Sequence, residues 1–99
     1  MVQINWTTQA RDDLKAIAEF IITDSIKYAR LQVSKIRSKT QVLKTHQNSG
    51  RMVPEFDNPA IRELIEGRYR IVYKNVSDNR IDILTIHHSA RDMTRRELE

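Results

Sequence analysis

Cationic side chains recur in strand-like segments of the second half of the chain, where a closed core would favour apolar residues. Arg70 lies in the run G-R-Y-R-I-V-Y (67–73), and His87 and His88 end a later run. A guanidinium can hold a phosphate or carboxylate through two parallel hydrogen bonds. An imidazole titrates near neutral pH and can act as a general acid or base. Anion binding and proton transfer are therefore the chemistry that this region offers.

Residues 69–74 are predicted to alternate between the two faces of a strand. The aromatic residues should face packed helices, which leaves Arg70, Val72 and Lys74 on the open face of the sheet. An ordinary solvated face explains Lys74, whereas Arg70 in mid-sheet suits a grip on an anionic group of a target. Replacing Arg70 by Ala should then reduce activity and alter the melting temperature little. The alternative is a structural Arg70 paired with Glu63 on the adjacent strand.

The two consecutive histidines should face opposite sides of their strand. One of His87 and His88 is then packed or capping, and the other can titrate near neutral pH. Adjacent strand residues cannot converge on one metal ion, and the chain has no cysteine to assist. We therefore expect no metal site and no cofactor.

Composition limits the class of protein. Ninety-nine residues with 39% apolar content predict one domain spanning 1–99. A net charge of +4 and a pI near 9.7 favour an acidic partner, either nucleic acid or protein, although solubility alone would also explain them. The absence of cysteine fits a reducing cytoplasm. Residues 1–6 resemble neither a signal peptide nor a membrane span, so we expect a cytoplasmic protein without membrane association.

The pattern of apolar residues predicts two helices among four strands. Thr7 or Thr8 should cap the first helix, and Asp24 or Ser25 the second. The apolar spacing of the second helix begins at Ile26 and runs to Leu43, and Gly50 is a plausible left-handed stop. Strands are expected at 2–6, 61–65, 69–76 and 81–88, with a loop at 54–59 and a frayed tail or single helical turn at 91–99. The order β-α-α-β-β-β predicts an α+β fold in which a helical hairpin packs on one face of a small, mainly antiparallel sheet.

This order, with the G-R-Y-R-I-V-Y run and the H-x-x-x-R spacing of His87 and Arg91, resembles the RelE/ParE superfamily of bacterial toxins. These are the toxin halves of type II toxin–antitoxin pairs, and the resemblance covers nearly the whole chain. It implies a cognate antitoxin as partner. By similarity, Arg70 holds the position of an arginine that the ribonuclease members use to hold the scissile phosphate, and Arg91 resembles a second phosphate-contacting arginine.

Departures from the ribonuclease branch favour the ParE, or plasmid-stabilisation, branch. RelE enzymes carry lysines on the strand before the Tyr-Arg pair and an aromatic residue near the C-terminus. Here that strand carries Arg62 and Glu63 without lysine, and no aromatic residue follows Tyr73 to stack on an RNA base. The sequence R-E-L (62–64) before Gly67 resembles ParE toxins, which bind DNA gyrase and trap it on cleaved DNA.

The favoured interpretation is a ParE-like toxin that inhibits DNA gyrase and is neutralised by its antitoxin. Its target-binding candidates are Arg62, Arg70, Lys74 and Arg91. Three apolar residues of the second helix, opposite its core face, are candidates for receiving the antitoxin: Tyr28, Leu31 and Val42.

Two alternatives remain open. The first is a RelE-like endoribonuclease acting on ribosome-bound messenger RNA. Arg70 and Arg91 would then hold phosphate, and His87 or His88 would transfer protons. The second is a non-toxic remnant that only binds its antitoxin.

Overall fold

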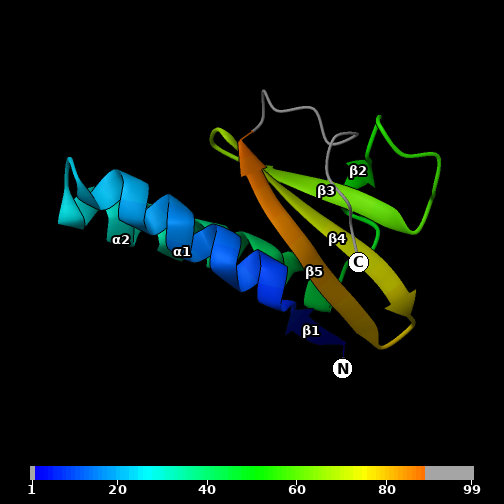
Figure 1. Cartoon of the computed structure of the whole chain (residues 1–99). Coiled ribbons are helices and arrows are strands. Elements are labelled where there is room, and N and C mark those ends of the chain that lie inside the picture. The colour runs from blue at the N-terminus through cyan, green and yellow to red at the C-terminus, as the bar shows by residue number, and fades with distance from the viewer. Residues whose placement is uncertain (1, 89–99) are drawn as a thin grey trace.

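A five-stranded mixed sheet packs against a hairpin of two helices (Figure 1). The computed structural model describes residues 2–88. Its elements are β1 (Gln3–Trp6), α1 (Thr8–Ile22), α2 (Ile26–Thr40), the 3-10 turn η1 (Gln41–Lys44), β2 (Arg51–Met52), β3 (Ile61–Glu66), β4 (Tyr69–Ser77) and β5 (Arg80–His88). The strand order is β1-β5-β4-β3-β2, with β1 parallel to β5 and the other pairs antiparallel. The predicted α+β fold is confirmed, and β2 is a strand that the sequence analysis did not predict.

Each helix begins at a hydroxyl cap, as predicted. The hydroxyl of Thr7 accepts the N–H of Ala10 at 3.1 Å, and that of Ser25 accepts the N–H of Tyr28 at 3.0 Å. These bonds satisfy amides that have no partner within the helix. The Thr7 hydroxyl also donates to the carbonyl of Ile83 at 2.8 Å, which fixes the start of α1 against β5. Neither helix is long and apolar enough to cross a membrane.

The second helix departs from the prediction at both ends. Ile26, expected on the core face, is 57% exposed, because the tip of the hairpin extends beyond the sheet (Figure 1). At the other end α2 stops at Thr40 rather than at Leu43. The chain continues as η1, which still buries Leu43.

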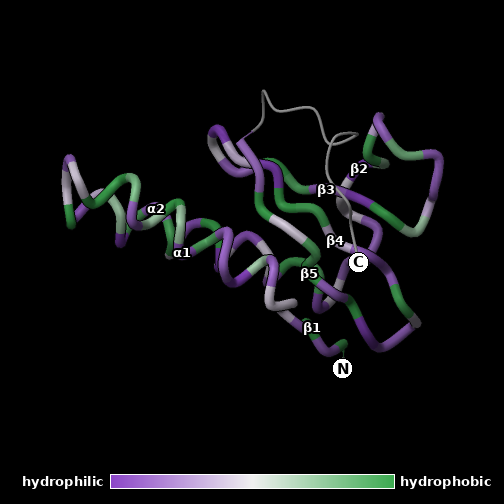
Figure 2. Tube along the Cα trace, viewed as in Figure 1, coloured by the Kyte–Doolittle hydropathy of each residue, from purple (hydrophilic) through white to green (hydrophobic). Residues whose placement is uncertain are grey.

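The main core lies between the hairpin and one face of the sheet. Its buried members are Ala10, Leu14, Ile36, Leu43, Leu64, Ile71, Tyr73, Ile81, Ile83 and Ile86. Ile71 and Tyr73 face the helices as predicted. Figure 2 shows hydrophobic residues running through the central strands, while the turns that join β3 to β4 and β4 to β5 are hydrophilic. Burial of each large apolar side chain contributes about 1.5–3 kcal/mol, so this layer fixes the hairpin on the sheet.

The opposite face of the sheet is covered, and the prediction of an open face is wrong. A second buried cluster consists of Val53, Val72 and Leu84, with Phe56 and Ile61 partly buried against it. The segment between β2 and β3 brings Val53 and Phe56 over the strands. Arg70 and Val72 are therefore buried, whereas Lys74 is exposed as predicted.

Gly50 is required for space, not for a left-handed turn. Among the described residues only Gly67, which turns β3 into β4, has a positive φ, at 59°. A Cβ at Gly50 would lie 2.5 Å from the carbonyl oxygen of Glu63 and 2.7 Å from the hydroxyl of Tyr73. The predicted left-handed stop is thus wrong. The close approach of the chain before β2 to β3 and β4 explains the glycine.

Candidate functional site

Arg70 lies at the centre of a cluster of four charged side chains on the second face of the sheet. Its Nε donates to Oε1 of Glu63 at 2.6 Å. Its Nη1 and Nη2 donate to the two carboxylate oxygens of Glu55, each at 2.7 Å. Glu63 also accepts from Nε of Arg51 at 2.6 Å. Strands β2, β3 and β4 and the segment after β2 therefore meet at this cluster of two arginines and two glutamates.

The guanidinium of Arg70 is enclosed and already bound on two edges. Arg70 is 5% exposed and Glu63 is 1% exposed. The hydrogen bond to Glu55 is the largest cause of a raised pKa at Arg70; burial opposes it, and Glu63 raises the pKa further. Arg70 thus stays charged, and its two-point geometry serves carboxylates of the same chain. The prediction of an accessible guanidinium is wrong, and the alternative pairing with Glu63 is confirmed.

The two histidines face opposite sides of β5, as predicted. His87 is buried and lies opposite Arg70 in the β4–β5 register. His88 is exposed, and its ring meets the edge of the Tyr69 ring with centroids 6.0 Å apart. A role for either histidine in proton transfer stays a prediction. No group of three or more His, Cys, Asp or Glu side chains within residues 2–88 is placed to hold a metal ion.

The remaining target-binding candidates occupy separate places. Nη1 of Arg62 donates to the carbonyl of Gly50 at 2.9 Å. Nε of Arg62 is buried without a hydrogen-bond partner among the described residues. Lys74 is exposed on β4. Arg91 lies outside the described residues. Contact of any of these cations with a target stays a prediction.

The three antitoxin-binding candidates are exposed, as predicted. Tyr28 and Leu31 lie on α2, but Val42 belongs to η1. The helical spacing that aligned all three residues therefore does not extend to Val42. Their role stays a prediction.

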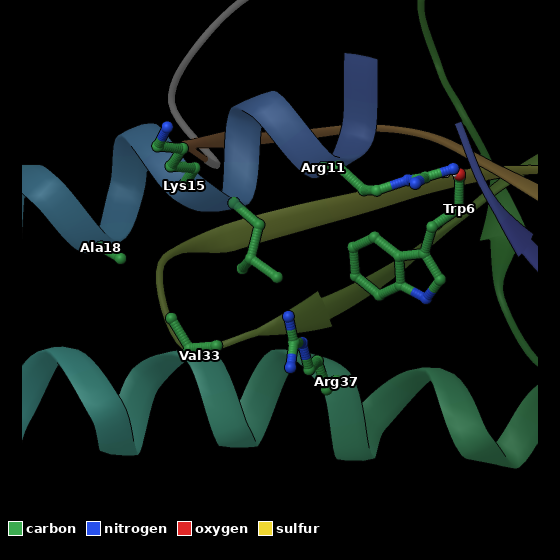
Figure 3. Close-up of a pocket in the computed structure, with 7 residues that line it drawn as sticks. Trp6, Arg11, Lys15, Ala18, Val33 and Arg37 are labelled. Carbon is green, nitrogen blue, oxygen red and sulfur yellow. Dashed lines mark hydrogen bonds between the residues drawn. The ribbon is translucent and has the colours of Figure 1, made fainter. Parts of the chain in front are cut away.

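A groove between α1 and α2 was not predicted. Its inner part, a cavity of about 460 Å³, lies where β1 meets the helices (Figure 3), and its lining residues are Trp6, Arg11, Leu14, Lys15, Ala18, Val33 and Arg37. Its outer part runs toward the tip and is lined by Ala18, Ile22, Ile26, Ala29, Arg30, Val33, Ser34, Arg37 and Ser38. Three residues line both parts, so they form one continuous surface, which we call the hairpin groove. Periodicity within one helix could not reveal a surface that two helices and a strand build together.

Asp13 is another functional contact that the sequence did not indicate. Its carboxylate accepts the hydroxyl of Thr85 and the N–H of Ile86, the latter at 3.1 Å. A charge expected to favour the start of a helix instead joins α1 to the centre of β5.

Comparisons with known proteins agree with this fold. The family model for the ParE toxin of the parDE type II toxin–antitoxin system matches residues 4–93. A solved structure of a chromosomal ParDE system from P. aeruginosa is 26% identical, with a TM-score of 0.72 over 89% of this chain and 96% of that chain. No curated protein matches the chain.

Two further solved structures share the fold. One is the toxin–antitoxin complex RelBE2 from Mycobacterium tuberculosis, with 20% identity and a TM-score of 0.50 over 88% of this chain and 96% of that chain. The other is the YoeB–YefM toxin–antitoxin complex from Staphylococcus aureus. It has 18% identity and a TM-score of 0.55 over 89% of this chain and 97% of that chain.

Proposed function

The chain belongs to the ParE toxin family of type II toxin–antitoxin systems, and from this premise we propose that it inhibits DNA gyrase and that a cognate antitoxin neutralises it. The family match over residues 4–93 carries the proposal. The similarity to a ParDE system that was solved as a toxin–antitoxin pair supports the antitoxin partnership. Both activities belong in the cytoplasm, where gyrase acts on DNA.

The closed Arg70 cluster favours gyrase over messenger RNA as the target. Cleavage of RNA requires cations around the scissile phosphate together with an acid and a base. Arg70 instead binds Glu55 and Glu63, so a phosphate at this point would have to displace Glu55 and meet the negative charge of Glu63. His87, the histidine opposite Arg70 on β5, is buried. These features support inhibition through protein contacts rather than phosphate chemistry.

Lys74 is the cation that best suits contact with the target. It is exposed on β4 and makes no ion pair within residues 2–88. Replacing Lys74 by Glu should therefore reduce toxicity without unfolding the protein. Lys44, an exposed lysine on η1 outside the sheet, provides the matched control when replaced in the same way.

Induction of the chain in cells tests the proposal, with DNA damage and messenger-RNA cleavage measured separately. We expect induction of the DNA-damage response and no new message ends by primer extension. Expression of the small acidic protein encoded beside the toxin should restore growth. Codon-phased cuts in messages would assign the chain to the RelE-like endoribonucleases. Normal growth with intact antitoxin binding would identify a non-toxic remnant.

A further inference from the structure

The hairpin groove combines an apolar floor with a basic rim. Trp6, Leu14 and Val33 lie between the helices in its inner part (Figure 3). Ile22 and Ile26 line its outer part and are 48% and 57% exposed. Single exposed apolar residues are ordinary on a protein surface. Here they continue a concave strip that already holds the only tryptophan of the chain, which is the form of a partner-binding surface.

Four cations from both helices surround this strip. Arg11 and Lys15 come from α1, and Arg30 and Arg37 come from α2. Within residues 2–88 no ion pair joins any of the four to a carboxylate. Arg11 donates from Nε to the carbonyl of Trp6 at 3.1 Å and so stays at the edge of the groove. The rim therefore attracts negative charge that this chain does not supply.

The shape selects a helical segment as the occupant. The lining residues of α2 extend from Ile26 to Ser38, a rise of about 18 Å at 1.5 Å per residue, which a helix of about 12 residues matches. An amphipathic helix can place its apolar face on the floor of such a groove and its charged flanks on the rim. A nucleic-acid backbone would satisfy the rim but leave the apolar floor exposed to water.

We propose that the hairpin groove is the docking site for an acidic, amphipathic helical segment of the antitoxin. This inference rests on the antitoxin partnership proposed above and gives it a place on the surface. It differs from the docking surface predicted at Tyr28, Leu31 and Val42, none of which lines the groove.

Binding to the intact chain can be followed by its own fluorescence, because Trp6 lies in the groove. The first titrant is the small acidic protein encoded beside the toxin. The second is a synthetic helical peptide of about 12 residues, with Leu along one face and Glu on both flanks. Both should shift the Trp6 emission to shorter wavelength and saturate. A control peptide with Lys in place of each Glu should not bind.

Charge reversal on α2 separates the groove from general electrostatic attraction. The test variant is Arg30→Glu/Arg37→Glu. The control is Lys27→Glu/Lys39→Glu, which makes the same change of charge at exposed positions of the same helix outside the groove. We expect the Kd for the acidic protein to rise about tenfold or more for the test variant and less than about threefold for the control.

Each other outcome overturns the inference in a recognisable way. Equal losses in both variants would indicate attraction by net charge alone. Unchanged binding in the groove variant, with weakened binding in Leu31→Ser/Val42→Ser, would place the antitoxin on the opposite side of α2. Duplex DNA that displaces the acidic peptide from the groove would assign the site to nucleic acid. Failure of the unmodified chain to bind the neighbouring acidic protein would instead refute the antitoxin partnership itself, and the groove assignment with it.

Discussion

Replacement of Arg70 by Ala is expected to destabilise the folded protein, because it leaves Glu63 buried without its enclosed partner. The Glu63 side chain is fully inaccessible, whereas its other partner, Arg51, keeps 65% of its side chain accessible. Loss of one member of a buried ion pair costs about 3–5 kcal/mol. Arg51 still compensates Glu63 in part, so we expect a loss at the lower end, about 3 kcal/mol. This outcome is opposite to the small change of melting temperature expected for an Arg70 on an open face.

The same geometry sets the cost of replacing Glu55. Its side chain is 17% accessible, and Arg70 would keep its bond to Glu63. We therefore expect Glu55→Ala to cost only about 1–2 kcal/mol. In the double variant the second change should add little, because Glu55 can turn to solvent once Arg70 is absent.

Urea unfolding at neutral pH, followed by Trp6 fluorescence and circular dichroism, measures these free energies. Lys74→Ala is the matched control, since it removes an exposed cation from the same strand and should change stability by less than about 0.5 kcal/mol. An Arg70→Ala variant within about 0.5 kcal/mol of the unmodified chain would refute the buried-pair explanation. Additive costs for Arg70 and Glu55 would refute their coupling.

Three further tests address the core. Burial raises the pKa of the Tyr73 hydroxyl above its ordinary value of 10.0. Its stabilising contribution is therefore complete below that pH and is lost as pH rises through the raised pKa, so melting temperature should fall less in Tyr73→Phe than in the unmodified chain between about pH 9 and 11. Gly50→Ala should cost about 1–3 kcal/mol in urea unfolding, because the new Cβ meets the backbone of Glu63; an unchanged midpoint would contradict this. Gln32→Leu should stabilise the protein by about 1 kcal/mol in the same assay, because the buried Nε2 of Gln32 has no partner among the described residues. A loss of stability would indicate that this amide is hydrogen-bonded.

The features predicted correctly from the sequence are those that neighbouring residues determine. The caps at Thr7 and Ser25, the two helices and the three long strands depend on local hydrogen bonding and on apolar spacing within one segment. The ends of β3, β4 and β5 agree with the prediction to within one residue. The opposite faces of His87 and His88 follow from alternation in a strand in the same way.

The candidate site depends on contacts between distant segments and was therefore mispredicted in part. Arg70 is enclosed by Glu55, which lies 15 residues away in a segment without regular periodicity. The same segment buries Val72, so alternation within β4 identified the two faces but not what covers them. The hairpin groove likewise requires Trp6 of β1 to meet Val33 of α2, a proximity that no single element encodes.

Inhibition of DNA gyrase is tested most directly with the purified chain, gyrase, ATP and relaxed plasmid. We expect the chain to reduce supercoiling in proportion to its concentration and to leave cleaved plasmid after the enzyme is removed with protease and detergent. Prior addition of the antitoxin should prevent both effects. Full supercoiling without cleaved plasmid at a concentration where the same preparation cuts ribosome-bound messenger RNA would contradict the proposed function.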